Sequence, residues 1–323
     1  MAEQYIYAVA RVRGKELQLL NGTFMETLIA SAGYDEALRL LADKGWICEE
    51  GETPEQLLKR ERTKTWDFVA ELVEDMSVFD VFLYANDYHN LKAAVKDAVT
   101  YQDHPEAYIA KEQCTIDPGP LKQALRDHQF DALPEEMRAV AEEAMETLLH
   151  TGDSQLADVI IDRAALAHIY EASKKTGNEI LELYGELTVA SADIKTALRA
   201  NRTGKDLTFI KRALAPCKTL DVARLAQAAS EGPDAIYEYL SRTDYSAAVD
   251  EIKKSPSAFE RWCDNRIIAD MRPQIHNPFT IGPLAAYILA RENEIKTVRI
   301  VLSGKHNDLP EETIRERVRE MYV

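Results

Sequence analysis

The sequence has 323 residues, of which 46% are hydrophobic and 29% are charged, and its formal net charge at pH 7 is −16. This acidic balance argues against a nucleic-acid partner and against direct adhesion to anionic lipid, because both require a basic surface. No stretch of about 18 apolar residues occurs, so no membrane-spanning segment is expected. Residues Met1–Tyr5 also lack the basic and apolar regions that begin a secretory signal.

Helix signals dominate the chain. Leu, Ala, Glu, Lys and Arg fill the periodic segments, only 13 residues are Gly, and valine-rich alternating runs are missing. A proline followed by an acidic residue marks expected helix starts at Pro54, Pro134 and Pro310, because the acid suits the positive end of the helix dipole. The sequence therefore predicts an all-α protein.

The clearest expected helix covers residues 283–303, between Gly282 and Gly304. Its apolar residues follow spacings of three, four and seven and share one face. Arg291 interrupts that face, so we expect the face not to be uniformly buried. The apolar positions are Leu284, Ile288, Ile295, Val298 and Leu302.

This helix has two relatives earlier in the chain. Three segments read polar, aliphatic, Lys, small, apolar, and successive copies are 103 and 101 residues apart. Seven residues before each aliphatic position stands an apolar residue. The segments are Asn90-Leu91-Lys92-Ala93-Ala94, Asp193-Ile194-Lys195-Thr196-Ala197 and Glu294-Ile295-Lys296-Thr297-Val298.

A second correspondence has the same period. The segments that begin at Asp162 and Asp264 lie 102 residues apart, and Pro or Gly interrupts helical periodicity at 117–120 and 215–217. We therefore predict three similar helical subdomains, residues 1–116, 117–215 and 216–323. Three copies can close around a pseudo-threefold axis or form an open superhelix, and both arrangements agree with the sequence.

The sequence offers no set of residues for catalysis or for a cofactor. Three Gly-Lys pairs begin at Gly14, Gly204 and Gly304, but none has the other glycine and the hydroxyl residue of a phosphate-binding loop. We interpret these glycines as helix C-caps. No histidine pair has metal-ligand spacing, and the four cysteines are scattered without a CxxC pair. We expect no metal, no cofactor and reduced structural thiols.

The recurring lysines Lys92, Lys195 and Lys296 allow two interpretations. Each could form a helix–helix ion pair that stabilises its own copy of the repeat. Alternatively, the three could form a ring of cations around a central depression and contact a partner. The adjacent acidic pairs, such as Glu49-Glu50, are interpreted as solvated surface, because adjacent residues on a helix point in different directions.

Four segments together carry a resemblance to a known family. They are the opening Tyr5–Arg13, the segment Asn86-Asp87-Tyr88-His89-Asn90-Leu91-Lys92, residues 193–199 and the stretch 282–296. The family that they resemble is the C subunit of the archaeal and bacterial V/A-type ATPases, which is related to the d subunit of eukaryotic V-ATPases. In that order the segments are similar to the family's start, to its Asn-Asp-x-x-Asn-Leu-Lys/Arg element, to the second occurrence of that element and to the last helix pair. The resemblance covers essentially the whole chain.

The resemblance implies a funnel-shaped helical protein with pseudo-threefold symmetry and no catalytic activity. In that family the protein sits on the cytoplasmic face of the membrane rotor ring as a peripheral protein. Its depression receives the central stalk of subunits D and F, and it transmits torque between the ATP-hydrolysing head and the ion-translocating proteolipid ring. The expected partners are therefore these stalk and ring subunits, with ion transport coupled to ATP hydrolysis or synthesis.

The interaction residues are assigned from the repeat and from the resemblance. Lys92, Lys195 and Lys296 are candidates for the interaction surface, and so are Arg11 and Arg13 in the opening segment. The two arginines could equally pin the N-terminal helix to the third repeat. Two other classes of function remain as alternatives. One is a cytosolic helical-repeat scaffold that binds peptides in an open groove, and the other is a small hydrolase.

Overall fold

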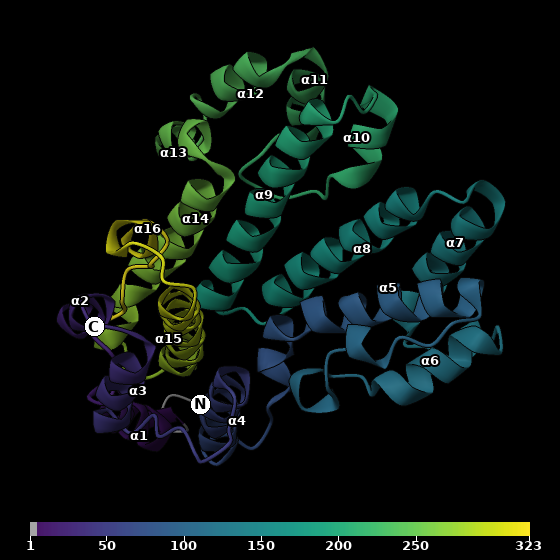
Figure 1. Ribbon diagram of the computed structural model, residues 1–323. Helices are drawn as coiled ribbons and strands as arrows, with labels where there is room; N and C mark the ends of the chain where they lie inside the picture. Colours follow the sequence, from purple (N-terminus) through teal and green to yellow (C-terminus); the bar gives the residue numbers. More distant parts are fainter. Residues whose placement is uncertain (1–4) are drawn as a thin grey trace. The chain divides into compact units, whose positions relative to one another are not determined.

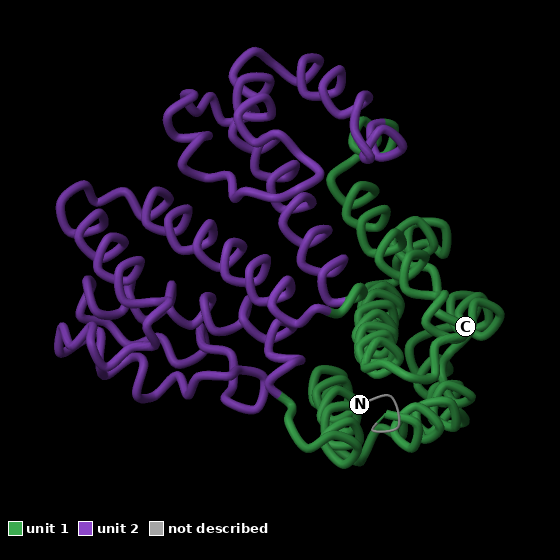
Figure 2. The backbone as a smooth tube through the Cα atoms, turned by 180° about the vertical axis from the view of Figure 1, so that it is seen from behind, with its two compact units in different colours: residues 1–76, 178–180, 250–323 green, residues 77–177, 181–249 purple. Residues whose placement is uncertain are grey.

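The computed structural model describes residues 5–323, and within that range every regular element is a helix. The predicted all-α class is therefore confirmed (Figure 1). The chain divides into two compact units, drawn in two colours in Figure 2. Unit 1 contains residues 1–76, 178–180 and 250–323, and unit 2 contains residues 77–177 and 181–249. The division into three repeats and the funnel shape stay predictions.

Unit 1 brings the two ends of the chain together. Its N-terminal helices pack with helices from the last quarter of the sequence, and α4 and α15 form an extensive helix pair. The elements are α1 (Ile6–Glu16), α2 (Gly22–Ile29), α3 (Tyr34–Asp43), α4 (Pro54–Ala70), α13 (Val249–Lys254), α14 (Pro256–Met271), the 3-10 helix η7 (Arg272–His276), α15 (Gly282–His306) and α16 (Glu311–Arg315).

The core of unit 1 joins residues that are far apart in the sequence. Leu28 and Leu41 from the N-terminal part lie in one hydrophobic cluster with Ile295, Val298 and Leu302 of α15. All of them are buried, as the apolar stripe of the expected helix predicts. The ends of the chain therefore stabilise each other through burial of apolar surface.

The expectation that Arg291 breaks the burial of this stripe is wrong. Arg291 is only 8% exposed, because its guanidinium forms ion pairs with Glu61 of α4 and Glu294 of α15 and lies 4.8 Å from the ring of Trp46. A buried charge is tolerated where other charges and hydrogen bonds satisfy it.

Unit 2 contains most of the two remaining predicted repeat cores. Helices α5, α7 and α8 pack together, and α8 also contacts α10. The elements are η2 (Ser77–Phe82), α5 (Tyr84–Thr100), η3 (Pro105–Ala107), η4 (Lys111–Gln113), α6 (Pro118–Arg126), η5 (Phe130–Ala132), α7 (Glu135–Thr151), α8 (Ser154–Lys175), most of α9 (Glu179–Arg202), α10 (Leu207–Ala213), α11 (Val222–Glu231), α12 (Pro233–Leu240) and η6 (Ser246–Ala248).

Local sequence explains several helix starts. The Thr53 side chain accepts the backbone N–H of Gln56, and the Gln56 side chain accepts the backbone N–H of Thr53, so α4 begins with a complete capping box. At the other two expected starts, Pro134 and Pro310 are the residues directly before α7 and α16. Asp117, in the first predicted break, caps α6 by accepting the N–H of Gly119.

The interpretation of the three glycines as residues that end helices is correct only for Gly204. That residue follows the end of α9 and has a φ of 64°, which glycine adopts at low cost. Gly14 lies inside α1, and Gly304 lies inside α15. A Cβ atom at Gly304 would lie 2.6 Å from Cγ1 of Ile314, so this glycine allows α16 to approach α15.

Other expectations concern thiols, membranes and the N-terminus. None of the four cysteines forms a disulfide within residues 5–323, in agreement with the expected reduced thiols. Among residues 5–323, no helix combines the length and the apolar character that crossing a bilayer requires. Residues 1–4, which carry most of the expectation about a secretory signal, lie outside the described part of the chain.

Candidate interaction surface

The five candidate residues are distributed over both units. Lys92 on α5 and Lys195 on α9 belong to unit 2, whereas Lys296 on α15 and both arginines on α1 belong to unit 1. Lys195 is exposed on its helix. No hydrogen bond or ion pair links Lys296 to Arg11 or Arg13 within residues 5–323.

Lys92 forms an ion pair between two helices. Its Nζ atom lies 2.6 Å from Oδ1 of Asp162 on α8. One turn further along α5, Lys96 pairs with Asp158 at 2.8 Å. The lysine number rises by four where the aspartate number falls by four, as two antiparallel helices require. These pairs hold α5 against α8, which agrees with the interpretation of Lys92 as an intrachain pair.

Lys296 has an equivalent arrangement in unit 1. Its Nζ atom contacts the carboxylate of Asp264 on α14, and Nε of Arg319 also donates to that carboxylate at 2.9 Å. Asp162 and Asp264 are the aspartates that begin the second repeated segment. In two of the copies, the lysine of the first repeated pattern therefore pairs with the aspartate of the second. The positions of the two patterns in the sequence did not indicate this contact.

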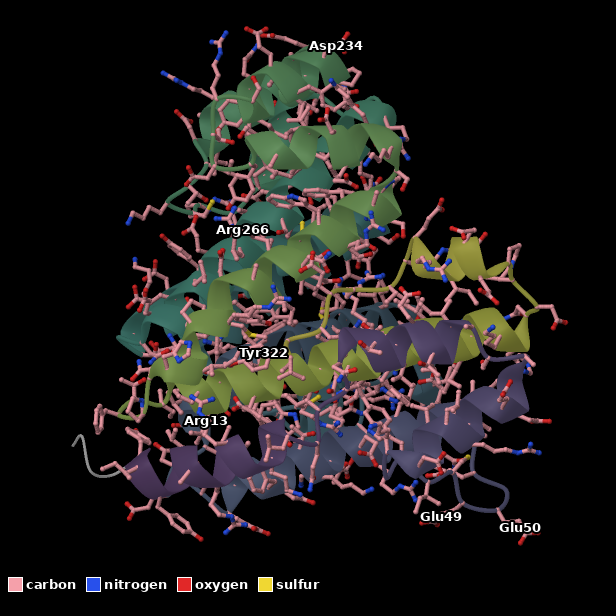
Figure 3. The ribbon with its side chains drawn as sticks, turned by 90° about the vertical axis from the view of Figure 1, so that its left-hand side faces the viewer. Arg13, Glu49, Glu50, Asp234, Arg266 and Tyr322 are labelled. Atoms are coloured by element: carbon pink, nitrogen blue, oxygen red, sulfur yellow. The ribbon has the colours of Figure 1, made fainter. Side chains whose placement is uncertain are left out.

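The two arginines of α1 behave differently. Arg13 forms an ion pair with Glu16, and its Nη2 atom donates to the backbone oxygen of Gln274 at 2.6 Å. It therefore pins α1 to η7, which agrees with the structural alternative. Figure 3 labels Arg13 on α1 and also Tyr322, which is the second-last residue of the sequence. Burial raises the pKa of the Tyr322 hydroxyl to about 12, Glu16 acts in the same direction, and Arg13 opposes it.

Arg11 is the more accessible arginine of the pair. Its guanidinium donates to the Tyr7 hydroxyl at 2.7 Å and lies 5.7 Å from the centre of the Phe68 ring. Its contact with Glu71 is long, at 4.0 Å, and both side chains are largely exposed. A weak and exposed pair costs little to break, so these contacts hold Arg11 less firmly than those of Arg13.

The repeat contains a structural role that sequence reasoning missed. The polar residue directly before the repeated aliphatic position is buried in all three copies: Asn90 and Asp193 are 0% exposed, and Glu294 is 2% exposed. Each accepts the backbone N–H of an irregular segment. The donors are Ile109 to Asn90 at 2.8 Å, Ala215 to Asp193 at 3.0 Å, and Leu20 to Glu294.

The chain positions of these donors differ in an informative way. Ile109 follows Asn90 by 19 residues and Ala215 follows Asp193 by 22, whereas Leu20 precedes Glu294 by 274 residues. In the first two copies the donor therefore lies in the segment that follows the helix. In the third copy the N-terminal segment of the chain supplies the donor instead. The only available sequence signal was the recurrence of a polar residue inside an apolar pattern.

Burial changes the acidity of two of these side chains. It raises the pKa of Asp193 to about 7, although the N–H of Ala215 and the charge of Arg163 oppose the shift. Burial also raises the pKa of Glu294 to about 7, against the opposing effects of Arg291 and the Leu20 N–H. Oδ2 of Asp193 has no hydrogen-bond partner among the described residues. These carboxylates accept backbone N–H groups, although burial destabilises their charged form.

The acidic pair at Glu49-Glu50 is solvated, as expected, but it does not lie on a helix. Both residues are in the loop between α3 and α4, and Figure 3 shows them at the edge of the molecule. Glu49 lies 2.5 Å from Arg60 of α4. The pair offers no converging carboxylates for chemistry.

Comparisons with known proteins give matches along the length of the chain. The family model described as ATP synthase (C/AC39) subunit matches residues 8–317. The V-type sodium ATPase C subunit of Enterococcus hirae is 23% identical over 323 aligned residues, which cover 96% of this chain and 97% of the relative.

Two further relatives come from a thermophilic bacterium and an archaeon. The V-type ATP synthase C subunit of Thermus thermophilus is 24% identical, and the match covers 98% of this chain and 99% of the relative. The A-type ATP synthase C subunit of Methanocaldococcus jannaschii is 21% identical, with 96% of this chain and 85% of the relative covered.

Proposed function

This chain belongs to the ATP synthase (C/AC39) subunit family, and on that premise we propose that it is a non-catalytic rotor subunit of a V/A-type ATPase or ATP synthase. In this role it links the central stalk, made of subunits D and F, to the proteolipid ring on the cytoplasmic side of the membrane. It transmits torque between them as a peripheral protein. ATP hydrolysis or synthesis and ion movement take place on other subunits.

The observation that carries this proposal is the end-to-end correspondence with proteins named as the C subunit of such complexes. The relatives from Enterococcus hirae and Thermus thermophilus are matched over nearly their full lengths. The correspondence therefore covers these relatives nearly from end to end, and not one part of them alone.

The construction of unit 1 supports a mechanical role. A part that transmits torque must resist shear, and close packing gives helical proteins low compressibility. Besides their shared core, the N- and C-terminal parts are joined by polar contacts. Arg62 forms a two-pronged pair with Glu292, its nitrogens lying 2.7–2.9 Å from the carboxylate, and Lys305 donates to the Ser31 carbonyl at 2.6 Å. A paired guanidinium and carboxylate fix orientation as well as distance.

The candidate partner contacts are polar. We propose that Lys92, Lys195 and Lys296 contribute to the surface that contacts the stalk, with Arg11 as an accessible charge on α1. Because Lys92 and Lys296 already pair with aspartates, a partner's carboxylate would have to share or replace these pairs. Binding should therefore weaken as salt rises, since exposed charges are screened.

The direct test is size-exclusion chromatography with light scattering on the purified chain mixed with its own D–F stalk, at low and moderate salt. We expect a stable complex that contains one copy of each protein. Separate elution at micromolar concentrations, with the membrane ring also present, would contradict the proposal and favour the peptide-binding scaffold.

A charge-exchange series separates contact with the stalk from support of the fold. Lys92→Glu removes both the intrachain pair with Asp162 and any contact with a partner's acid. The double variant Lys92→Glu/Asp162→Lys restores the intrachain pair alone. Binding that stays weak in the double variant supports a direct contact, whereas restored binding assigns Lys92 to the fold. Lys211→Glu, at an exposed position on α10, is the matched control.

A further inference from the structure

A small basic pocket lies inside unit 1, apart from the repeated lysines. It is formed between α1, the loop after α3, α4 and α15, and its volume is about 210 Å³. We name it the α1–α15 pocket and define it by Lys15, Lys44, Trp46, Lys64, Tyr287 and Arg291. Sites for drug-sized ligands usually have about 300–1,000 Å³, so this pocket suits a smaller group.

The charge of the pocket is opposite to that of the chain. Four cations line it, Lys15, Lys44, Lys64 and Arg291, and Glu61 is the one acidic residue in its lining. Glu294 lies behind Arg291 and pairs with it, so four positive charges face two negative ones, an excess of two. On a chain with a net charge of −16, such an excess favours a small anion at this position.

The inner wall of the pocket is held in place before any ligand arrives. Nε of Arg291 donates to Oγ1 of Thr65 at 3.2 Å, and its two terminal nitrogens donate to Glu294 and Glu61. A guanidinium has five N–H groups, so these contacts leave further donors on it. A fixed arginine loses little side-chain entropy when it binds an anion.

Two other polar groups at the wall have no partner. Tyr287 is 5% exposed and Trp46 is 2% exposed, and both line the pocket. Neither the Tyr287 hydroxyl nor the Trp46 indole N–H makes a hydrogen bond to any residue in 5–323. Neither atom is among the buried polar atoms that lack a partner, so both reach solvent and can donate to water or to an acceptor that enters the pocket.

The lysines at the rim can reach such an acceptor. Lys64 is 53% exposed, and its Nζ atom lies 2.6 Å from Glu61. Lys15 lies 5.5 Å from the Phe68 ring, and Lys44 lies 5.3 Å from the Phe24 ring, so aromatic faces support both ammonium groups. The donors come from four separate segments of chain and surround the space from several directions.

We propose that the α1–α15 pocket binds one tetrahedral oxyanion of the phosphate type. Donors on several sides fit the oxygens of a tetrahedral anion better than the planar pair of oxygens in a carboxylate. Lys15, Lys44 and Lys64 supply charge, while Tyr287, Trp46 and Arg291 supply hydrogen bonds from the wall. The phosphate group can come from free phosphate or a soluble phosphate monoester, or from a lipid headgroup.

The test is isothermal titration of the full-length chain with inorganic phosphate and with glycerol 3-phosphate, with ionic strength held constant by NaCl. We expect saturable binding of one anion with a Kd on the order of 1 mM, which sulfate competes and chloride does not. Loss of one rim lysine should weaken binding roughly five-fold. The triple variant Lys15→Gln/Lys44→Gln/Lys64→Gln should abolish it, while Lys211→Gln should bind as the wild type does.

A second variant tests the wall without removing a charge. Tyr287→Phe keeps the edge-to-face contact with Phe68, whose ring centre lies 5.6 Å away, so its fold should be unchanged by circular dichroism. Loss of a hydrogen bond to a charged oxygen should weaken phosphate binding roughly ten-fold. Absence of saturable binding up to about 20 mM phosphate, or equal binding by the wild type and the triple variant, would overturn the proposal.

Vesicle sedimentation distinguishes the sources of the anion. The chain is mixed with phosphatidylcholine vesicles that contain or lack phosphatidic acid. The pocket binds a lipid headgroup if sedimentation requires phosphatidic acid, if free phosphate prevents it and if the triple variant does not sediment. Binding of phosphate in solution without sedimentation assigns it to the free anion or a soluble monoester.

Discussion

Asp193 of α9 provides a test of how the repeated buried polar position acts. The Asp193→Asn variant keeps an oxygen that can accept the Ala215 N–H and removes the buried negative charge. The first copy already contains an amide at this position. There, Asn90 accepts the N–H of Ile109 and donates to the Ile109 carbonyl at 3.0 Å. An amide is thus compatible with the geometry of the repeat.

The magnitude follows from the change in acidity. The pKa of Asp193 rises from 3.8 to about 7 because the side chain is buried. At a pH between these two pKa values, Asp193 is protonated in the folded state and ionised in the unfolded state. Its contribution to stability therefore falls as pH rises from about 4 to about 7. Between pH 5 and pH 8 the loss is on the order of 2 kcal/mol.

The assay is urea unfolding followed by far-UV circular dichroism at pH 5, 6, 7 and 8, with each transition fitted separately if two are resolved. The variant should gain stability relative to the wild type as pH rises, by on the order of 2 kcal/mol across this range. Glu142→Gln, at an exposed position on α7, is the control and should show a constant difference. A difference for Asp193→Asn that does not change with pH would refute the reasoning.

Three further predictions concern buried charge, close helix contact and surface pairs. Arg291→Met leaves Glu294 buried without its cation and should cost about 3–5 kcal/mol of unfolding free energy, whereas Arg299→Met, at an exposed pair with Glu55, should cost less than about 1 kcal/mol in the same urea assay. Gly185→Ala places a Cβ atom 2.6 Å from that of Ser173 and should cost about 1–3 kcal/mol; added Ser173→Gly should recover part of the loss, and no recovery would show that steric conflict is not the cause. Lys92→Ala should lower the unfolding free energy by less than about 1 kcal/mol, because its partner Asp162 is about half exposed. A larger loss in the same urea assay would show that Lys92 acts mainly in the fold.

Features encoded by neighbouring residues could be predicted from the sequence. The start of α4 follows from Thr53, Pro54 and Gln56, which interact within one turn of helix. The long α15 follows from the spacing of its apolar residues, although the helix continues to His306, past the expected end. At Gly304 the same residue type that ends many helices instead makes room for Ile314.

Features that depend on distant residues could not be predicted. Arg291 looks like an interruption of an apolar face until Glu61, 230 residues earlier, supplies its ion pair. Likewise, nothing near Leu20 indicates that its N–H binds Glu294. The recurring lysines were visible as a pattern and so were Asp162 and Asp264, but only the fold brings Lys92 to the first and Lys296 to the second. Burial, which raises the pKa of Asp193, likewise arises from tertiary packing.

The most direct measurement is electron cryo-microscopy of the intact ATPase purified through an affinity tag on this chain. We predict one copy per complex, located between the base of the D–F stalk and the cytoplasmic face of the proteolipid ring, with the chain keeping one orientation relative to the stalk in every rotational state. Density for the chain on a peripheral stalk or on the catalytic head, or several copies per complex, would contradict its role as the rotor link.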